Sequence, residues 1–268
     1  MHRIDKTPCE LLHNAFCKRI LGVYKSTSNI ISKAEIGRLP LSFYIILQVI
    51  KYWNHILEKP IDSLLHQSYL SELNNSSEWT SFVKTILTLC DLQNKWDNQT
   101  ILNNNEMSIL KSNLRKMFLK LYCDAKKPDH LKFSFNLQLQ TRSNLLMPAE
   151  YTKMNIPLIY RKGLTRIRLQ SNRLGIVTGR FSRPVTPLQN RICPTCKVLD
   201  DENHLFWNCS LTEQIRVDFQ NHFTTRFANF INLDADTKTN LLLNPLNEND
   251  AILCGKFINK IGCKRNLF

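Results

Sequence analysis

Three cysteines and one histidine occupy one short stretch of the chain, within the string CPTCKVLDDENHLFWNC. Their spacing is C-x2-C-x7-H-x4-C, and thiolates and imidazoles are the side chains that bind zinc in proteins. Two cysteines two residues apart can hold one edge of a tetrahedral ion, and the seven-residue connection lets the chain turn back to supply the opposite edge. The pattern predicts one structural Zn2+ ion, with no open position for water, held by Cys193, Cys196, His204 and Cys209.

Two other interpretations of this cluster stay open. Cysteine is often buried as a small hydrophobic residue, so the four residues could be unrelated members of a core. A redox C-x-x-C motif is the second, although no βαβ pattern surrounds it. The other six cysteines are scattered over helical patterns, where core packing accounts for them: Cys9, Cys17, Cys90, Cys123, Cys254 and Cys263.

A strongly basic segment leads directly into the cluster. Between Arg161 and Arg191 there are eight Lys and Arg residues and no Asp or Glu in 31 positions. Arginine dominates, as bidentate phosphate recognition prefers, although a solvated helix face that pairs with distant acids is the alternative. We expect a nucleic-acid surface whose affinity falls steeply with salt and which has little sequence selectivity. Its candidate residues are Arg161, Lys162, Arg166, Arg168, Arg173, Arg180 and Arg183.

Composition limits the class of protein. Of 268 residues, 43% are hydrophobic, which is enough for a core and too much for a disordered tail. The formal net charge of +14 indicates a polyanionic partner, more often nucleic acid than a membrane surface. No charged-then-apolar leader opens the sequence, and the longest apolar run, after Pro40, is too short to span a bilayer. We therefore expect a soluble, intracellular protein with no membrane partner.

Apolar residues recur mostly at helical spacing, and glycine and proline are few. The fold class expected is mainly α, with a helical bundle followed by a small zinc-stapled (Cys-Cys-His-Cys) module and further helices after it. Helices are predicted at about 9–23, 41–58, 61–73, 78–92, 107–127, 157–174, 211–231, 235–243 and 248–262.

Four local details qualify this pattern. The first helix carries an apolar stripe that includes Leu12, Phe16 and Ile20, and the helix after Pro40 is apolar nearly all round, so it should be buried. The Asn-rich connection 94–106 is the best candidate for a boundary or a mobile loop. Alternating apolar residues favour a strand at 132–140.

With these residues in view, the chain resembles the C-terminal part of reverse transcriptases from non-LTR (LINE-like) retrotransposons. Three stretches carry the resemblance, in the same order as in the family. The first, FCKRILGVYKSTSNIISKAEIGRLPL with QVIKYWNHIL, is similar to the helical region after the polymerase palm. The second, GLTRIRLQSNRLGIVTGRF, is close to the run ahead of the family's zinc cluster. The third, RICPTCKVLDDENHLFWNCSLT, looks like the zinc-binding motif itself and is the most specific.

The resemblance implies a zinc-dependent module that helps to hold template RNA or target DNA next to the polymerase. It also implies the same four metal ligands and makes a nuclear location possible. On this basis we expect a helical post-polymerase region at 1–95, a helical basic region at 104–180, and a zinc-binding C-terminal module at 181–268.

The catalytic signatures of that family are absent from the sequence. No aromatic-Ala-Asp-Asp string occurs, and Tyr122, Cys123, Asp124 and Ala125 offer only one carboxylate. No PD…(D/E)-x-K arrangement follows the zinc cluster, and no G-x-S-x-G, glycine-rich phosphate loop or H-E-x-x-H motif appears. We therefore expect no enzymatic activity and no small-molecule substrate. A helical protein-interaction scaffold with a structural zinc site, or a relic of the element without function, are the alternatives.

Overall fold

The computed structural model describes residues 7–124, 147–225 and 229–268. These parts are mainly helical, and the β-type pairings within them are two isolated bridges, Ile36 with Pro148 and Ile192 with Leu199. The expected mainly α fold is confirmed, with the Cys-Cys-His-Cys cluster at 193–209 followed by helices. The strand predicted at 132–140 lies outside the described residues.

The chain divides into two compact units. The first comprises Met1–His13 and Leu39–Ala125, and the second comprises Asn14–Arg38 and Lys126–Phe268, so the boundary falls within helix α1 (Pro8–Leu21). These boundaries lie at other points than those of the predicted segments 1–95, 104–180 and 181–268, and that three-part division stays a prediction.

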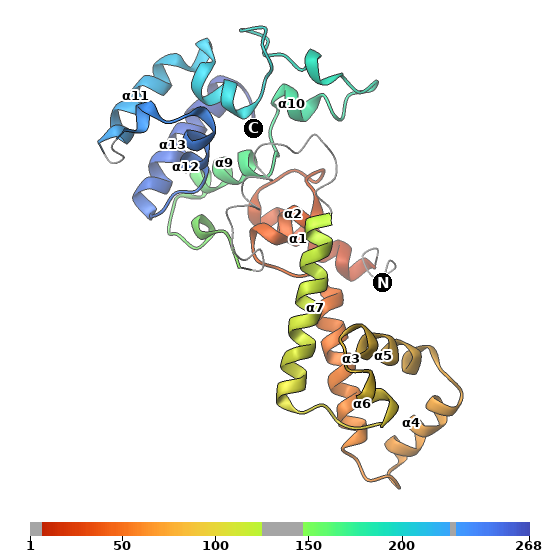
Figure 1. The fold of residues 1–268 in the computed structure, drawn as a ribbon. Helices are drawn as coiled ribbons and strands as arrows, with labels where there is room; N and C mark the ends of the chain where they lie inside the picture. Colours follow the sequence, from red (N-terminus) through yellow and green to blue (C-terminus); the bar gives the residue numbers. More distant parts are fainter. Residues whose placement is uncertain (1–6, 125–146, 226–228) are drawn as a thin grey trace. The chain divides into compact units, whose positions relative to one another are not determined.

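The first unit is built on α3 (Leu41–Leu57), a long helix that contacts several others (Figure 1). One face of α3 is buried and includes Ile46, Ile50 and Trp53, but Tyr52 is 50% exposed. The expectation that α3 is buried all round is therefore wrong, because its partners cover one side only. These partners are α4 (Leu64–Asn74), α5 (Glu78–Leu89) and α7 (Asn104–Asp124), while α6 (Gln93–Asp97) packs on α5.

The Asn-rich connection 94–106 lies within this unit, so the expectation of a boundary there is wrong, and the alternative of a mobile loop stays a prediction. Its apolar residues Trp96 and Leu102 are buried. The side chain of Asn54 on α3 donates to the carbonyl of Leu102 at 2.9 Å and accepts the N–H of the same residue at 3.0 Å. These two bonds satisfy the backbone N–H and carbonyl groups of Leu102, which lies outside the helices and has no helical partner for them.

The second unit is organised by the packing of α9 (Leu158–Arg168) against α13 (Glu248–Lys264), the pair with the most extensive contact in the structure (Figure 1). Gly255 permits this approach, because a Cβ there would lie 2.4 Å from the Cβ of Tyr160. By contrast, a Cβ at Gly163 on α9 would lie 3.4 Å from Cγ2 of Ile258, which is an ordinary contact distance. Other helices of this unit are α2 (Asn29–Glu35), α10 (Gly175–Thr178), α11 (Glu213–Thr224) and α12 (Ala235–Leu243).

Aromatic rings fill the core between α11, α12 and α13. Phe219 and Phe257 are stacked with ring centroids 4.1 Å apart, and Phe223 meets Phe230 at 4.7 Å. Trp207 packs against this group and donates its indole N–H to the hydroxyl of Thr239 at 2.7 Å. Trp207 lies on the π-helical turn η4 (His204–Asn208), so this core anchors the segment that carries His204.

Three helix predictions need correction. The helix predicted at 157–174 ends at Arg168, because Gln170 adopts a left-handed backbone with φ of 51°. The helix predicted at 211–231 covers only Glu213–Thr224 in the described residues, after the 3-10 turn η5 (Ser210–Thr212) and before the 3-10 turn η6 (Phe230–Asn232). In α1 the predicted apolar stripe is exposed, since Leu12, Phe16 and Ile20 are 52–73% accessible.

The two glycines at the α9–α13 contact give a matched pair of variants. We expect Gly255→Ala to destabilise the protein by about 1–3 kcal/mol, because the new methyl group overpacks against Tyr160. Gly163→Ala should be neutral or stabilising by up to about 1 kcal/mol, since alanine favours a helix and the space is available. Chemical denaturation measures both, and equal effects of the two substitutions would contradict the packing described here.

Candidate metal centre

The four predicted ligands come together in the second unit. The donor atoms of Cys193, Cys196, His204 and Cys209 all lie within 4.8 Å of one another, and these residues can hold a metal ion. The sulfur atoms of Cys196 and Cys209 are 3.9 Å apart. Two sulfurs bound at about 2.3 Å to one tetrahedral ion lie about 3.8 Å apart, so this edge has the dimension that such an ion requires.

A tight turn presents the first two cysteines. The N–H of Cys193 donates to the carbonyl of Val198 at 2.7 Å, and the N–H of Lys197 donates to the carbonyl of Cys193 at 3.0 Å. Lys197 takes a left-handed conformation with φ of 59°, which reverses the chain. The N–H of Cys196 then points to the sulfur of Cys193 at 3.5 Å, so the turn brings the backbone of the second cysteine against the first ligand.

The second two ligands flank the turn η4. Asp201 starts this turn by accepting the N–H of His204 at 2.8 Å, and the N–H of Cys209 closes it on the carbonyl of His204 at 2.7 Å. His204 and Cys209 are five positions apart, so one π-helical turn places both donors on the same side. Ser210 follows, and its N–H and hydroxyl lie 3.5 Å and 3.3 Å from the sulfur of Cys196.

The protonation of these groups fits ligation. Nε2 of His204 is buried and makes no hydrogen bond to any described residue, and burial lowers the pKa of this imidazole, which favours its neutral form. Hydrogen bonds from Ser210 lower the pKa of the Cys196 thiol, while burial raises that of Cys209. A cation among the sulfurs favours every thiolate, because its charge opposes the effect of burial.

Arg265, at the end of α13, completes the surroundings of the cluster. Its Nη1 lies 3.3 Å from the sulfurs of both Cys193 and Cys209, and its Nη2 donates to Oδ1 of Asp200 at 2.8 Å. The second oxygen of Asp200 accepts the N–H of Gly175 at 2.7 Å. Sequence reasoning missed Arg265, because it lies 56 residues after Cys209 and no local motif contains it.

The predicted nucleic-acid residues do not all lie on the surface. Arg168 is 1% exposed, and its guanidinium donates to Glu35, to the carbonyl of Leu243 and to the side chain of Asn244 at 2.5–2.7 Å. Its guanidinium also lies 4.9 Å from the ring centroid of Tyr151. Arg168 is therefore a structural residue inside the second unit, and it is removed from the predicted surface.

Other arginines of the basic segment are partly engaged. Nε of Arg166 donates to the carbonyl of Gly22 at 2.8 Å, and its guanidinium lies 5.5 Å from the rings of both Tyr24 and Phe268. Arg161 donates to the carbonyl of Met154 at 2.9 Å. Lys162, like these two arginines, is neither fully buried nor fully exposed.

Arg180 is partly buried and interacts electrostatically with Glu202. Burial lowers its pKa, and the charge of Glu202 acts in the opposite direction. Glu202 is fully buried, and burial raises the pKa of its carboxyl group to about 7. Arg180 therefore has a buried carboxyl group among its electrostatic partners. Of the seven residues predicted to bind nucleic acid, only Arg173 and Arg183 are exposed. Their side chains make no ion pair with the described residues.

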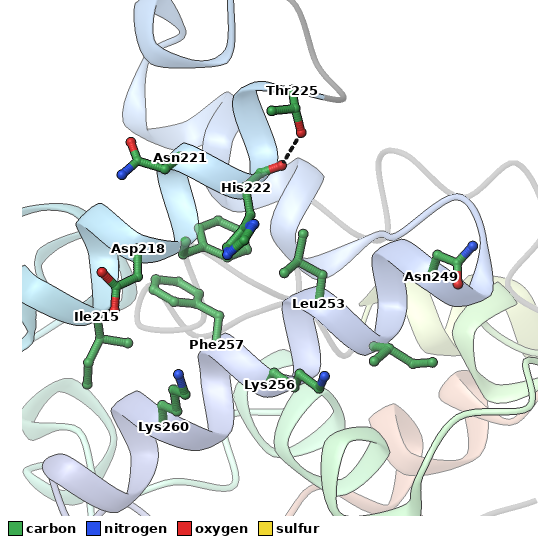
Figure 2. A pocket seen from close by; sticks show the side chains of 12 residues that line it. Ile215, Asp218, Asn221, His222, Thr225, Asn249, Leu253, Lys256, Phe257 and Lys260 are labelled. Carbon is green, nitrogen blue, oxygen red and sulfur yellow. Dashed lines mark hydrogen bonds between the residues drawn. The ribbon is translucent and has the colours of Figure 1, made fainter.

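A separate groove of about 760 Å³ lies between α11 and α13 (Figure 2). The buried rings of Phe219 and Phe257 line it. Among its described lining residues, no hydrogen bond joins two side chains, so it holds no nucleophile paired with a base. Its exposed polar side chains are Asp218, Asn221, His222, Thr225, Asn249, Lys256 and Lys260.

Comparison with known proteins identifies no relative: no family model, curated protein or solved structure matches this chain significantly. Within the residues that the structure describes, no helix combines the length and apolarity needed to cross a membrane.

The contacts of Arg265 predict that it supports metal binding. Arg265→Gln should weaken the apparent metal affinity about 10- to 100-fold, because residues that hydrogen-bond metal ligands contribute at that level. Competition with a chromophoric chelator measures this affinity. Lys264→Gln removes the same charge from the exposed preceding residue and should leave the affinity unchanged. Equal affinities of the two variants would show that the contacts with the sulfurs have no such role.

Proposed function

We propose that this chain is a non-catalytic, zinc-dependent nucleic-acid-binding segment of the kind found in the C-terminal part of non-LTR retrotransposon reverse transcriptases. The observation that carries the proposal is that the metal cluster and the basic segment share one carboxylate. Asp200 accepts a hydrogen bond from Arg265 at the cluster and another from Gly175 inside the basic segment. A metal ion that orders the cluster therefore also orders the segment with the exposed arginines.

Zinc is the ion that the donor set supports best. Three thiolates and one imidazole form a closed tetrahedral set typical of structural zinc, whereas calcium and magnesium prefer oxygen. With four protein ligands the ion has no open position, so its role is to stabilise the loop 191–209. A divalent ion with three thiolates leaves a net negative charge, which the guanidinium of Arg265 offsets.

RNA or DNA is the partner that the exposed charge supports. Arg173 and Arg183 stand in a segment without any acidic residue and make no ion pair with the described residues, so their guanidinium groups are available to phosphate. Template RNA or target DNA are the partners that the resemblance implies, and residence in the nucleus belongs to the same proposal. No small-molecule substrate and no catalytic step are part of it.

A helical protein-interaction scaffold is the second candidate. It is favoured by an apolar groove of about 390 Å³ on the first unit, lined by Tyr44, Ile45, Val49, Tyr52 and Trp79. Exposed apolar surfaces of this kind often mark protein contacts. Nucleic-acid binding by the basic segment separates the two candidates, because the scaffold does not require it.

The zinc assignment is tested by the metal content of the purified chain. We expect one zinc per chain by mass spectrometry, and its loss from both Cys193→Ser and His204→Ala. Because a structural zinc contributes on the order of 10 kcal/mol, both variants should lose amide-exchange protection around 191–213. Cys263→Ser, which replaces an exposed cysteine that is not one of the four ligands, should keep the metal. A zinc-free wild-type chain with unchanged folding in chelator would refute the assignment.

Nucleic-acid binding is tested by fluorescence anisotropy with labelled RNA and DNA between about 50 and 200 mM salt. The logarithm of the affinity should fall linearly with the logarithm of salt, with a slope of about −0.7 to −0.9 per phosphate contact. Arg173→Gln combined with Arg183→Gln should make that slope shallower by the contribution of about two phosphate contacts, one for each arginine. Lys111→Gln combined with Arg115→Gln, exposed on α7, removes equal charge elsewhere and should change it little. Absence of binding by the wild-type chain would favour the scaffold.

A further inference from the structure

A cavity of about 450 Å³ lies within the second unit, beside the turn that follows α9. Two stretches line it, one within residues 24–31 and one within 169–182. Its volume falls in the range of about 300–1,000 Å³ that is common for ligand pockets. The residues that bear on its chemistry are Tyr24, Thr27, Gln170, Arg173, Arg180 and Phe181.

Three residues that line this cavity carry buried polar atoms without partners. The hydroxyl oxygens of Tyr24 and Thr27 and both amide atoms of Gln170 are buried and make no hydrogen bond to the described residues. Thr27 is 7% exposed and Gln170 is 8% exposed. Buried polar atoms in proteins are nearly always hydrogen-bonded, so four such atoms around one cavity indicate the groups of a ligand or bound water.

Gln170 differs from its neighbours in the same turn. The hydroxyl of Ser171 accepts the N–H of Tyr24 at 2.8 Å, and the side chain of Asn172 accepts the N–H of Leu174 at 3.1 Å. Both side chains thus stabilise the turn, whereas the amide of Gln170 makes no such bond. Gln170 nevertheless holds a left-handed backbone with φ of 51°, a conformation that suits glycine better. That conformation is common in the residue that closes a helix, so the observation that points to a ligand is the buried amide without a partner.

The exposed part of the cavity offers an aromatic ring and positive charge. Phe181 is 66% exposed, so its ring is accessible for stacking. Arg173 is exposed and makes no ion pair with the described residues, and Arg180 lines the same cavity. A ring for stacking, an amide with one donor and one acceptor side, and a free guanidinium match the three parts of a nucleotide, namely its base face, its base edge and its phosphate.

We propose that this cavity receives one unpaired nucleotide of a single-stranded nucleic acid. The base stacks on Phe181 and bonds to Gln170, and the phosphate meets Arg173. A base in a duplex presents neither its face nor its pairing edge, so the cavity distinguishes single strands from duplexes. This inference rests on the proposed nucleic-acid function and adds a base-binding site to the phosphate contacts.

The test compares one 12-nucleotide sequence as single-stranded RNA, single-stranded DNA and blunt duplex, by fluorescence anisotropy with the full chain. Phe181→Ala should weaken binding of a single strand at least about fivefold, because base stacking contributes at that level. Binding of the duplex should change by about twofold or less. Val185→Ala removes a similarly exposed apolar residue that does not line the cavity and should behave as wild type. The RNA and DNA strands show which sugar the cavity accepts.

Gln170→Met provides an independent readout, because it keeps the length of the side chain and removes both amide atoms. If the amide serves a ligand, this variant should bind single strands at least about fivefold more weakly without a lower melting temperature. A lower melting temperature with unchanged binding would assign Gln170 a structural role and overturn the proposal.

A photo-crosslink separates failure of the cavity from failure of nucleic-acid binding. A single strand that contains 5-iodouridine should crosslink to Phe181 or Tyr24. Crosslinks only elsewhere, together with equal losses for single strand and duplex in Phe181→Ala, would refute the cavity and leave the proposed function standing. Ordered water alone in the cavity would give the same result. Wild-type protein that binds none of the probes would refute both.

Discussion

The convergence of three cysteine sulfurs and one imidazole is the constraint on which the loop 191–209 depends. The first half of this loop has little other support, because it buries few apolar side chains and leaves Ile192 and Val198 43% and 50% exposed. Its second half is also held by the core, because Leu205 and Phe206 are fully buried there. The first half of the loop is therefore the part of the second unit in which metal coordination replaces hydrophobic burial.

The buried pair of Arg168 and Glu35 shows why a count of charges overstates a binding surface. Both side chains are at most 4% exposed, and the guanidinium also bonds to Leu243 and Asn244. Removing one partner from such a pair leaves a buried charge, at a cost of about 3–5 kcal/mol. An arginine in a basic run, such as Arg168 of α9, can thus hold α2 and α12 against its own helix. Its guanidinium is then unavailable to phosphate. The sequence around Arg168 does not distinguish it from Arg173.

What could be predicted from the sequence follows from the distance along the chain over which each interaction acts. The four ligands lie within 17 residues, so their spacing alone indicated a common site. Helical periodicity likewise depends on residues three and four apart, and it identified α3, α5, α7, α12 and α13 with small errors at their ends.

The features that could not be predicted depend on partners far away in the sequence. Arg168 meets Glu35 at a separation of 133 residues, and Arg265 meets Cys209 at 56. The end of α9 was missed for a different reason. Gln170 takes the left-handed backbone that ends the helix, whereas a glycine at this position would have predicted the helix end from the sequence. The buried side of α1 carries Glu10 and Asn14. Because polar residues normally face solvent, the sequence predicted that the opposite, apolar side of this helix would be buried.

The residues after α13 connect the metal cluster to the basic turn. Arg265 contacts two ligand sulfurs, the carbonyl of Leu267 accepts the N–H of Arg173 at 3.1 Å, and the ring of Phe268 lies beneath Arg166. Leu267 is 1% exposed, so this tail is part of the core and cannot shift alone. At one end of the tail, Arg265 contacts the metal ligands. At its other end, Leu267 accepts the hydrogen bond from the turn that contains Arg173. The geometry of the basic turn is thus set by the same short segment that neutralises the metal ligands.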